Sequence, residues 1–196
     1  MTIRSLFLLA TFITMTPLLA TAQPDNTVEV TRGTDQATVS GVTRVKATVV
    51  GIDAATRTVT LKTSKGKVVD IEVGAEARNF DQLKVGDTVN AEYKEALTLS
   101  LRKGSGEASV NQSETADRSA PGAKPGGTVG REVRIMANVV AVNPQTRKVT
   151  VKGPQGNTVD LMVDNPDTLK NIKKGDRVEA VYTEALAISV EPAGKK

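Results

Sequence analysis

The sequence has no histidine and no cysteine. Without these residues a Ser-His-Asp or Cys-His nucleophile cannot be assembled, and the common transition-metal ligands reduce to carboxylates and methionine. Neither a glycine-rich phosphate-binding loop nor a dinucleotide fingerprint follows an expected strand. The sequence therefore predicts no cofactor, no metal site, no catalytic residue and a protein that is not an enzyme.

Aromatic residues are almost as scarce. There is no tryptophan, and after residue 22 the only aromatics are Phe80, Tyr93 and Tyr182. Proteins that bind single-stranded nucleic acid usually need exposed aromatic rings along a basic groove. Here acidic and basic residues are interspersed, and the net charge is only +4. We therefore expect no nucleic-acid partner, and we expect a core of small aliphatic side chains.

The first 22 residues have the pattern of a secretory signal peptide. Arg4 precedes an apolar run over Leu6–Leu19, and Ala20-Thr21-Ala22 supplies a small-residue cleavage site before Gln23. No cysteine follows that site, which excludes a lipid anchor, and no second run is long enough to span a bilayer. We therefore expect a periplasmic protein, cleaved near Ala22, with no transmembrane segment in the mature chain.

The rest of the chain is organised around one stretch that it contains twice. Both Lys84–Leu97 and Lys173–Leu186 read K-x-G-D-x-V-x-A-x-Y-x-E-A-L. The similarity extends over Ala47–Leu101 in the first copy and Ala137–Val190 in the second. An internal repeat of this kind predicts two copies of one small structural unit.

Each copy has the pattern of a small antiparallel β domain. Apolar and polar residues alternate with period 2, as in Thr58–Lys62, which is typical of strands with one wet face. Between the third and fourth strands, Phe80 and Leu83 are spaced i, i+3, as are Leu169 and Ile172, which predicts a helical turn. Five short strands with such a turn match the layout of an OB-type barrel.

We therefore predict an all-β protein with two small five-stranded OB-like barrels in tandem. A small open β sandwich, or a pair of units that exchange strands, is the alternative. The stretches before and between the units are polar or rich in Gly, Ser and Pro, and they bury too little surface to offset their ordering entropy. The predicted boundaries are a signal peptide over 1–22, a flexible arm over 23–41, a first domain over 42–102, a disordered linker over 103–130, a second domain over 131–191 and a tail over 192–196.

The repeated pattern V-V-x-I/V-D/N-x-x-T-R-x-V-T-L/V-K, then G-x-x-V-D, then the tyrosine-containing stretch resembles a group of uncharacterised bacterial periplasmic OB-like domains. The layout is also similar to that of the periplasmic copper chaperone of the Cus-type efflux system. In that family the metal is bound by His, two Met and Trp. Here His and Trp are absent, and the only methionines after the leader are Met136 and Met162, so the resemblance implies the fold without the metal ligands.

The candidate site residues are the duplicated tyrosines and the glutamates two positions after them: Tyr93, Glu95, Tyr182 and Glu184. The period-2 pattern places both rings on the inward face, so our main interpretation is a core ring with its hydroxyl at the rim. For the glutamates it is a polar loop residue that joins the fourth and fifth strands. The alternative is a carboxylate at the barrel mouth that contacts a ligand or partner.

The sequence thus predicts an exported, non-catalytic binding or scaffolding protein of the cell envelope. Its partner would be an envelope protein or a small ligand. The alternative is a divergent periplasmic protein that binds copper or another metal. A third hypothesis is a carboxylate-dependent enzyme that uses Glu95 and Glu184, or Asp70 and Asp160.

Overall fold

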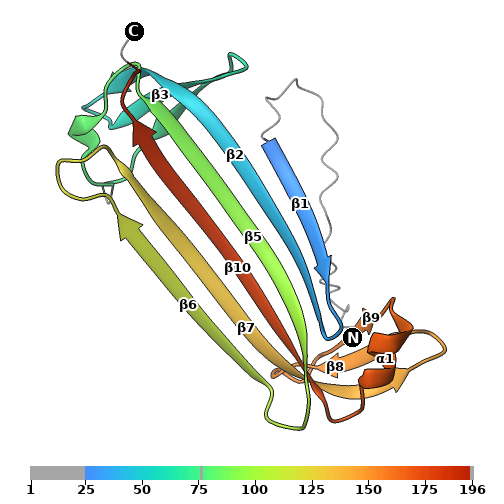
Figure 1. The fold of residues 1–196 in the computed structure, drawn as a ribbon. Helices are drawn as coiled ribbons and strands as arrows, with labels where there is room; N and C mark the ends of the chain where they lie inside the picture. Colours follow the sequence, from blue (N-terminus) through green and yellow to red (C-terminus); the bar gives the residue numbers. More distant parts are fainter. Residues whose placement is uncertain (1–24, 76, 195–196) are drawn as a thin grey trace, which may run out of the picture.

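The computed structural model describes residues 25–75 and 77–194, and in these residues the protein is all-β (Figure 1). Its strands form one antiparallel sheet in the order β4-β3-β2-β5-β10-β7-β8-β9, with β1 paired to β2 and β6 paired to β7. The expected signal peptide lies outside the described residues. Within them, no helix has the length and apolar character needed to cross a membrane.

Six long strands form the middle of the sheet in the order β1-β2-β5-β10-β7-β6. They are β1 (Asp25–Arg32), β2 (Gln36–Asp53), β5 (Thr88–Arg102), β6 (Ser109–Arg118), β7 (Gly126–Asn143) and β10 (Arg177–Glu191). A small unit extends the sheet at each end. The first contains β3 (Thr58–Thr63), β4 (Val68–Glu72) and the 3₁₀ turn η1 (Phe80–Gln82), and the second contains β8 (Lys148–Lys152), β9 (Thr158–Met162) and α1 (Pro166–Asn171).

The two copies of the repeat meet along β5 and β10, which pair over their whole length. Glu95 lies opposite Glu184 in this register. Tyr93 lies opposite Leu186, and Tyr182 lies opposite the equivalent Leu97. The pairing is therefore unchanged when the two copies are exchanged, and an approximate internal two-fold axis passes through the Glu95–Glu184 pair.

The sheet does not close, so the predicted pair of OB-like barrels is not found. The prediction placed a loop between a fourth and a fifth strand at Glu95, but β5 continues through Glu95 without a break. Neither Gly nor Pro occurs between Tyr93 and Leu97 to turn the chain back. The strand therefore stays extended and pairs with its counterpart β10 instead of returning to its own unit.

The segments predicted as a flexible arm and a disordered linker supply the two outer strands of the middle sheet. Residues 25–32 form β1 against β2, and residues 109–118 form β6 against β7. Their side chains are exposed, so little apolar burial signals their presence in the sequence. Backbone pairing to an existing edge orders them, and this depends on the neighbouring strand more than on their own composition.

Each end unit has its own hydrophobic core. The first consists of Ala47, Val49, Val59, Leu61 and Phe80, and the second of Ala137, Val139, Val149, Val151, Leu169 and Val178. The predicted helical turn is present in both units, as η1 and α1, and each places one buried side chain, Phe80 or Leu169, in the core. Gly86 and Gly175 follow these turns with φ of 96° and 95°, a conformation that favours glycine.

Candidate functional site

The two faces of the middle sheet differ in chemistry. Because side chains alternate along a strand, the pairing registers assign every residue of the six long strands to one face. We call the face that carries Tyr93 and Tyr182 the open face, and the opposite one the polar face. Both end-unit cores lie on the side of the open face, because Val89 packs against the first core and Leu99 against the second.

Large apolar side chains stand exposed on the open face. Those more than a third exposed are Val28, Val30, Val39, Val45, Leu97, Val110, Val129, Leu186 and Ile188. They come from all six long strands and share one face. Exposed apolar side chains gathered on one face make that face a candidate binding surface.

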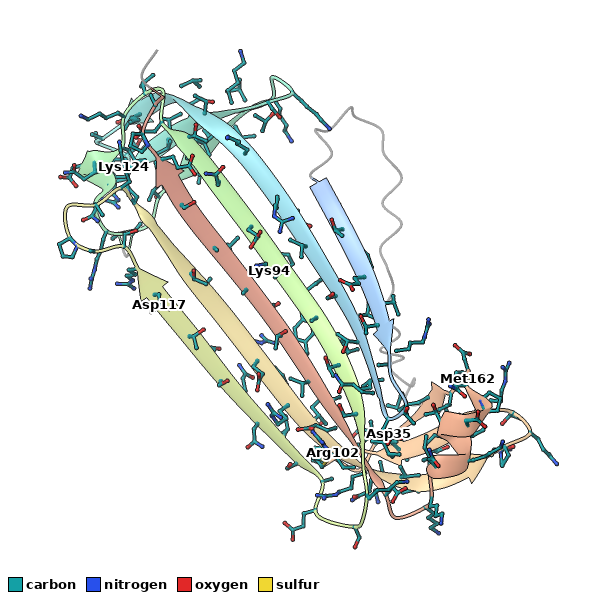
Figure 2. All side chains as sticks on the ribbon, viewed as in Figure 1. Asp35, Lys94, Arg102, Asp117, Lys124 and Met162 are labelled. Atoms are coloured by element: carbon teal, nitrogen blue, oxygen red, sulfur yellow. The ribbon has the colours of Figure 1, made fainter. Side chains whose placement is uncertain are left out.

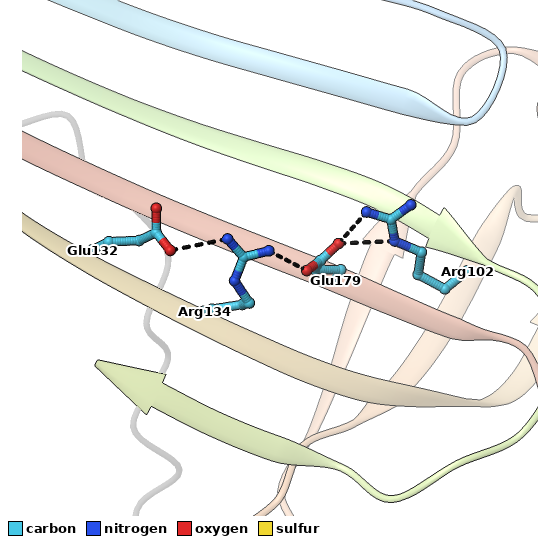
Figure 3. A network of polar contacts seen from close by, with 4 residues as sticks. All are labelled: Arg102, Glu132, Arg134 and Glu179. Atoms are coloured by element: carbon cyan, nitrogen blue, oxygen red, sulfur yellow. Dashed lines mark hydrogen bonds and ion pairs between the residues drawn. The ribbon is translucent and has the colours of Figure 1, made fainter. Parts of the chain in front are cut away.

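The polar face carries ion pairs instead. Figure 3 shows a chain of them across three strands, with Glu179 at its centre. The Glu179 carboxylate accepts from Arg102 Nε at 2.8 Å and from Arg134 at 2.6 Å, and Arg134 also contacts Glu132 at 3.0 Å. The two guanidinium groups hold the pKa of Glu179 below its usual value. This face is thus internally satisfied and suited to water.

The four predicted site residues come together at the middle of the open face. The Tyr182 hydroxyl donates to Glu184 Oε2 at 3.0 Å. The Tyr93 hydroxyl is 3.4 Å from the same oxygen and 3.4 Å from Glu95 Oε2. We call these four residues the Tyr–Glu cluster. The glutamates lie in mid-strand, so their interpretation as loop residues is wrong, and the tyrosines are half-buried outside both hydrophobic cores.

The surroundings of the Tyr–Glu cluster favour neutral tyrosines. Burial raises the pKa of Tyr182, and the hydrogen bonds with Tyr93 and Glu184 raise it further. Burial likewise raises the pKa of Tyr93 above its usual value, with the nearby charges of Glu95 and Glu184 acting in the same direction. Both hydroxyls therefore stay protonated at neutral pH and can act as hydrogen-bond donors there.

The cluster is not symmetric in charge. Arg131 lies beside Glu184 in the pairing register, with Nε 3.6 Å from Oε1, and its side chain is 46% exposed. The equivalent neighbour of Glu95 is Gly41, and Glu95 has no ion-pair partner in the described part of the chain. A shallow depression of about 500 Å³ lies next to the cluster, lined in part by Tyr93, Val129, Arg131 and Leu186.

Two aspartates outside the cluster, Asp87 and Asp176, are buried at equivalent positions of the repeat. Each accepts from the backbone N–H three residues earlier, at 2.8 Å and 2.9 Å. Each also binds a lysine from the segment that was predicted to be a linker, Asp87 to Lys124 and Asp176 to Lys103. The repeated K-x-G-D motif could have revealed both residues, but it does not indicate their partners.

The remaining candidates from the sequence do not converge on one site. Met162 lies in the end unit opposite to the one near Lys124 (Figure 2), and Met136 lies in the middle strand β7. Asp70 and Asp160 accept from Thr60 and Thr150 across strand pairs in separate end units. In residues 25–75 and 77–194, no group of three or more acidic residues is arranged to hold a metal ion. The comparisons with known proteins add no function: no protein-family model, curated protein or solved structure matches the chain.

Ultraviolet titration can test the Tyr–Glu cluster because the chain has only two tyrosines and no tryptophan. We expect both phenols to ionise above the ordinary pH of about 10. The Glu184→Gln variant should lower the pKa of Tyr182, because it removes a nearby negative charge. The Glu132→Gln variant, on the polar face, is the control and should leave both unchanged.

The raised pKa values of the two tyrosines also predict how the stability of the protein changes with pH. A raised pKa in the folded state stabilises the protein fully below the unfolded pKa of about 10, and this contribution is lost as the pH rises above it. Wild-type tyrosines that both titrate near pH 10 while the protein is still folded would show that the cluster does not form.

Proposed function

We propose that this protein is an exported, non-catalytic binding or scaffolding protein of the cell envelope, and that the open face is its binding surface. One observation carries the proposal: a single-layer sheet exposes large apolar side chains from six strands on one face only. A sheet that is apolar on one face normally buries that face against a second layer. The second layer is here supplied by whatever the protein binds.

The Tyr–Glu cluster fits binding better than catalysis. Its hydroxyls donate to carboxylates and have raised pKa values, so neither tyrosine is activated as a base or nucleophile. It offers a few polar groups in the middle of an apolar surface, which is how binding surfaces fix the orientation of a partner. Export is supported by the apolar run and the Ala20-Thr21-Ala22 site of the leader.

The test compares two neighbouring residues of β7 that point to opposite faces. Val129 on the open face is 55% exposed, and Thr128 on the polar face is also exposed. The chain from Gln23, or its Val129→Lys or Thr128→Lys variant, is immobilised and incubated with solubilised envelope proteins that include a tagged copy of the same chain. We expect Val129→Lys to lose the bound components and Thr128→Lys to retain them. Equal capture by all three proteins would show that the open face is not the binding surface.

A further inference from the structure

The middle of the open face has no covering layer in the described residues. Large apolar side chains of all six long strands are exposed on this face, so no described element packs across the middle of the sheet. The end units cover only the two ends, where Phe80 packs with the first core and Leu169 with the second (Figure 1). The open area is therefore bounded at both ends of the strands.

The size of this area is that of a protein interface. Six strands spaced about 4.8 Å apart are about 29 Å wide, and the stretch from Ala91 to Leu99 is about 27 Å long at about 3.4 Å per residue. The product is on the order of 800 Å², which is close to what one partner buries in a standard protein–protein interface. A small ligand on so open a surface would stay largely in contact with water.

We propose that the occupant of the open face is a second copy of this chain, packed face to face to make a two-layer homodimer. The dimer proposal rests on the proposed function of the open face as a binding surface, and it identifies the partner. The raised end units would collide if the two sheets were stacked with parallel long axes. Because the open area is roughly square, the two sheets can instead cross at about 90°, a known mode of sheet packing. Each copy then places its end units beside the outer strands β1 and β6 of the other.

The centre of the open face carries a charged row that a second copy would meet. Glu95, Glu184, Arg131 and Glu114 lie in this row across β5, β10, β7 and β6, so each copy contributes three carboxylates and one guanidinium group. Arg131 is half-exposed, and in the described part of its own copy it makes only a long contact to Glu184. A second copy brings another Arg131 to the centre, where Glu95 has no cation of its own. The tyrosine hydroxyls donate to Glu95 and Glu184, and the Gln112 side-chain amide donates to Glu114, so each of these carboxylates has a hydrogen-bond donor.

Analytical ultracentrifugation of the chain from Gln23 tests the proposal. We expect a dimer. The Val129→Lys variant should dissociate with a dissociation constant at least about 100-fold higher, because a lysine is then buried at an apolar interface. Thr128→Lys should remain dimeric. Circular dichroism confirms that each variant is folded, and Leu186→Lys replaces Val129→Lys if the latter is not.

Spin labels provide a second measurement, because the chain has no cysteine of its own. A label at Leu97→Cys lies on the open face and one at Thr98→Cys on the polar face. We expect a short intermolecular distance for the Leu97 label and a much longer one for the Thr98 label.

A monomeric wild-type chain, or a dimer that Val129→Lys leaves intact, would overturn the proposed dimer. A monomer that still captures another envelope component through Val129 would overturn the dimer alone and preserve the proposed function. A monomeric wild-type chain whose capture of envelope components is the same with and without Val129→Lys would overturn both the dimer and the proposed function.

Discussion

The Phe80→Ala variant is expected to lose about 3–5 kcal/mol of unfolding free energy, which is typical of removing a buried aromatic ring. Phe80 is the largest side chain in the first core and is 9% exposed. Its neighbours there are valine, alanine and leucine, which cannot expand to fill the cavity. The Arg57 guanidinium also lies 4.5 Å from the ring centroid and would lose that contact.

The matched control is Phe80→Leu. The second copy of the repeat has Leu169 at this position, buried in the equivalent core. Leucine is therefore compatible with this packing, and the loss should be less than half that of Phe80→Ala. Chemical denaturation measures both. Equal losses for the two variants would show that the ring makes contacts specific to an aromatic residue, and no loss for either would place Phe80 outside the core.

The position of Phe80 could be predicted from the sequence because the signal is local. The i, i+3 spacing of Phe80 and Leu83 predicted a helical turn, and the same spacing in the second copy gave the same result. The positive φ values of Gly86 and Gly175 are local in the same sense. The strands inside each repeat and their inward faces were also predictable from period-2 alternation, whereas β1, β6 and the continuity of β5 through Glu95 were not.

The open, continuous sheet could not be predicted in this way. In a duplicated sequence, a strand that can pair within its own copy can equally pair with the equivalent strand of the other copy. β5 pairs with β10, the equivalent strand of the other copy. The local sequence pattern around Glu95 would be the same whether the strand paired within its own copy or with the other one. The alternative of two units that exchange strands is closer to the observed arrangement than the expected barrels.

The sequence singled out the four residues of the Tyr–Glu cluster but did not predict that they lie together. Alternation places Tyr93 and Tyr182 each on the apolar face of its strand, but only the β5–β10 register brings them to one cluster. Their hydrogen-bond partners include a glutamate from the other copy, at a sequence separation of 91 residues for Tyr93 and Glu184. Arg131 was not predicted, because the equivalent residue in the first copy is Gly41 and the repeat therefore gives no signal for an arginine there.

The second large effect is expected at Asp87. This carboxylate is 2% exposed, and it accepts from Lys124 Nζ at 2.5 Å and from the Lys84 N–H at 2.8 Å. Burial alone would raise the pKa of Asp87, but Lys124 and the backbone donors outweigh burial and hold the pKa below its usual value. Asp87→Ala removes the acceptor of the Lys84 N–H and breaks the ion pair, while Lys124 keeps its bond to the Gln82 carbonyl at 2.8 Å. We expect a loss of about 3 kcal/mol, as for other broken ion pairs that are largely buried.

Asp176 provides the matched comparison, because its lysine is more exposed. The side chain of Lys103 is 58% exposed, whereas that of Lys124 is 22% exposed. Solvent screens the more exposed pair more strongly. Lys103→Ala should therefore cost clearly less unfolding free energy than Lys124→Ala, although the two aspartates occupy equivalent positions in the repeat.

Stability measured at acid pH distinguishes the contribution of the Asp87 charge from that of its packing. A carboxylate whose pKa is lowered by folding stabilises the protein above its unfolded pKa, and this contribution is lost as the pH falls through the folded pKa. The difference in unfolding free energy between wild type and Asp87→Asn should thus be largest near neutral pH and shrink in acid. A difference that stays constant with pH would mean that the pair with Lys124 contributes nothing. The cost of Asp87→Ala would then come only from its backbone hydrogen bond, and the segment between β6 and β7 would not be tied to the first end unit through its charge.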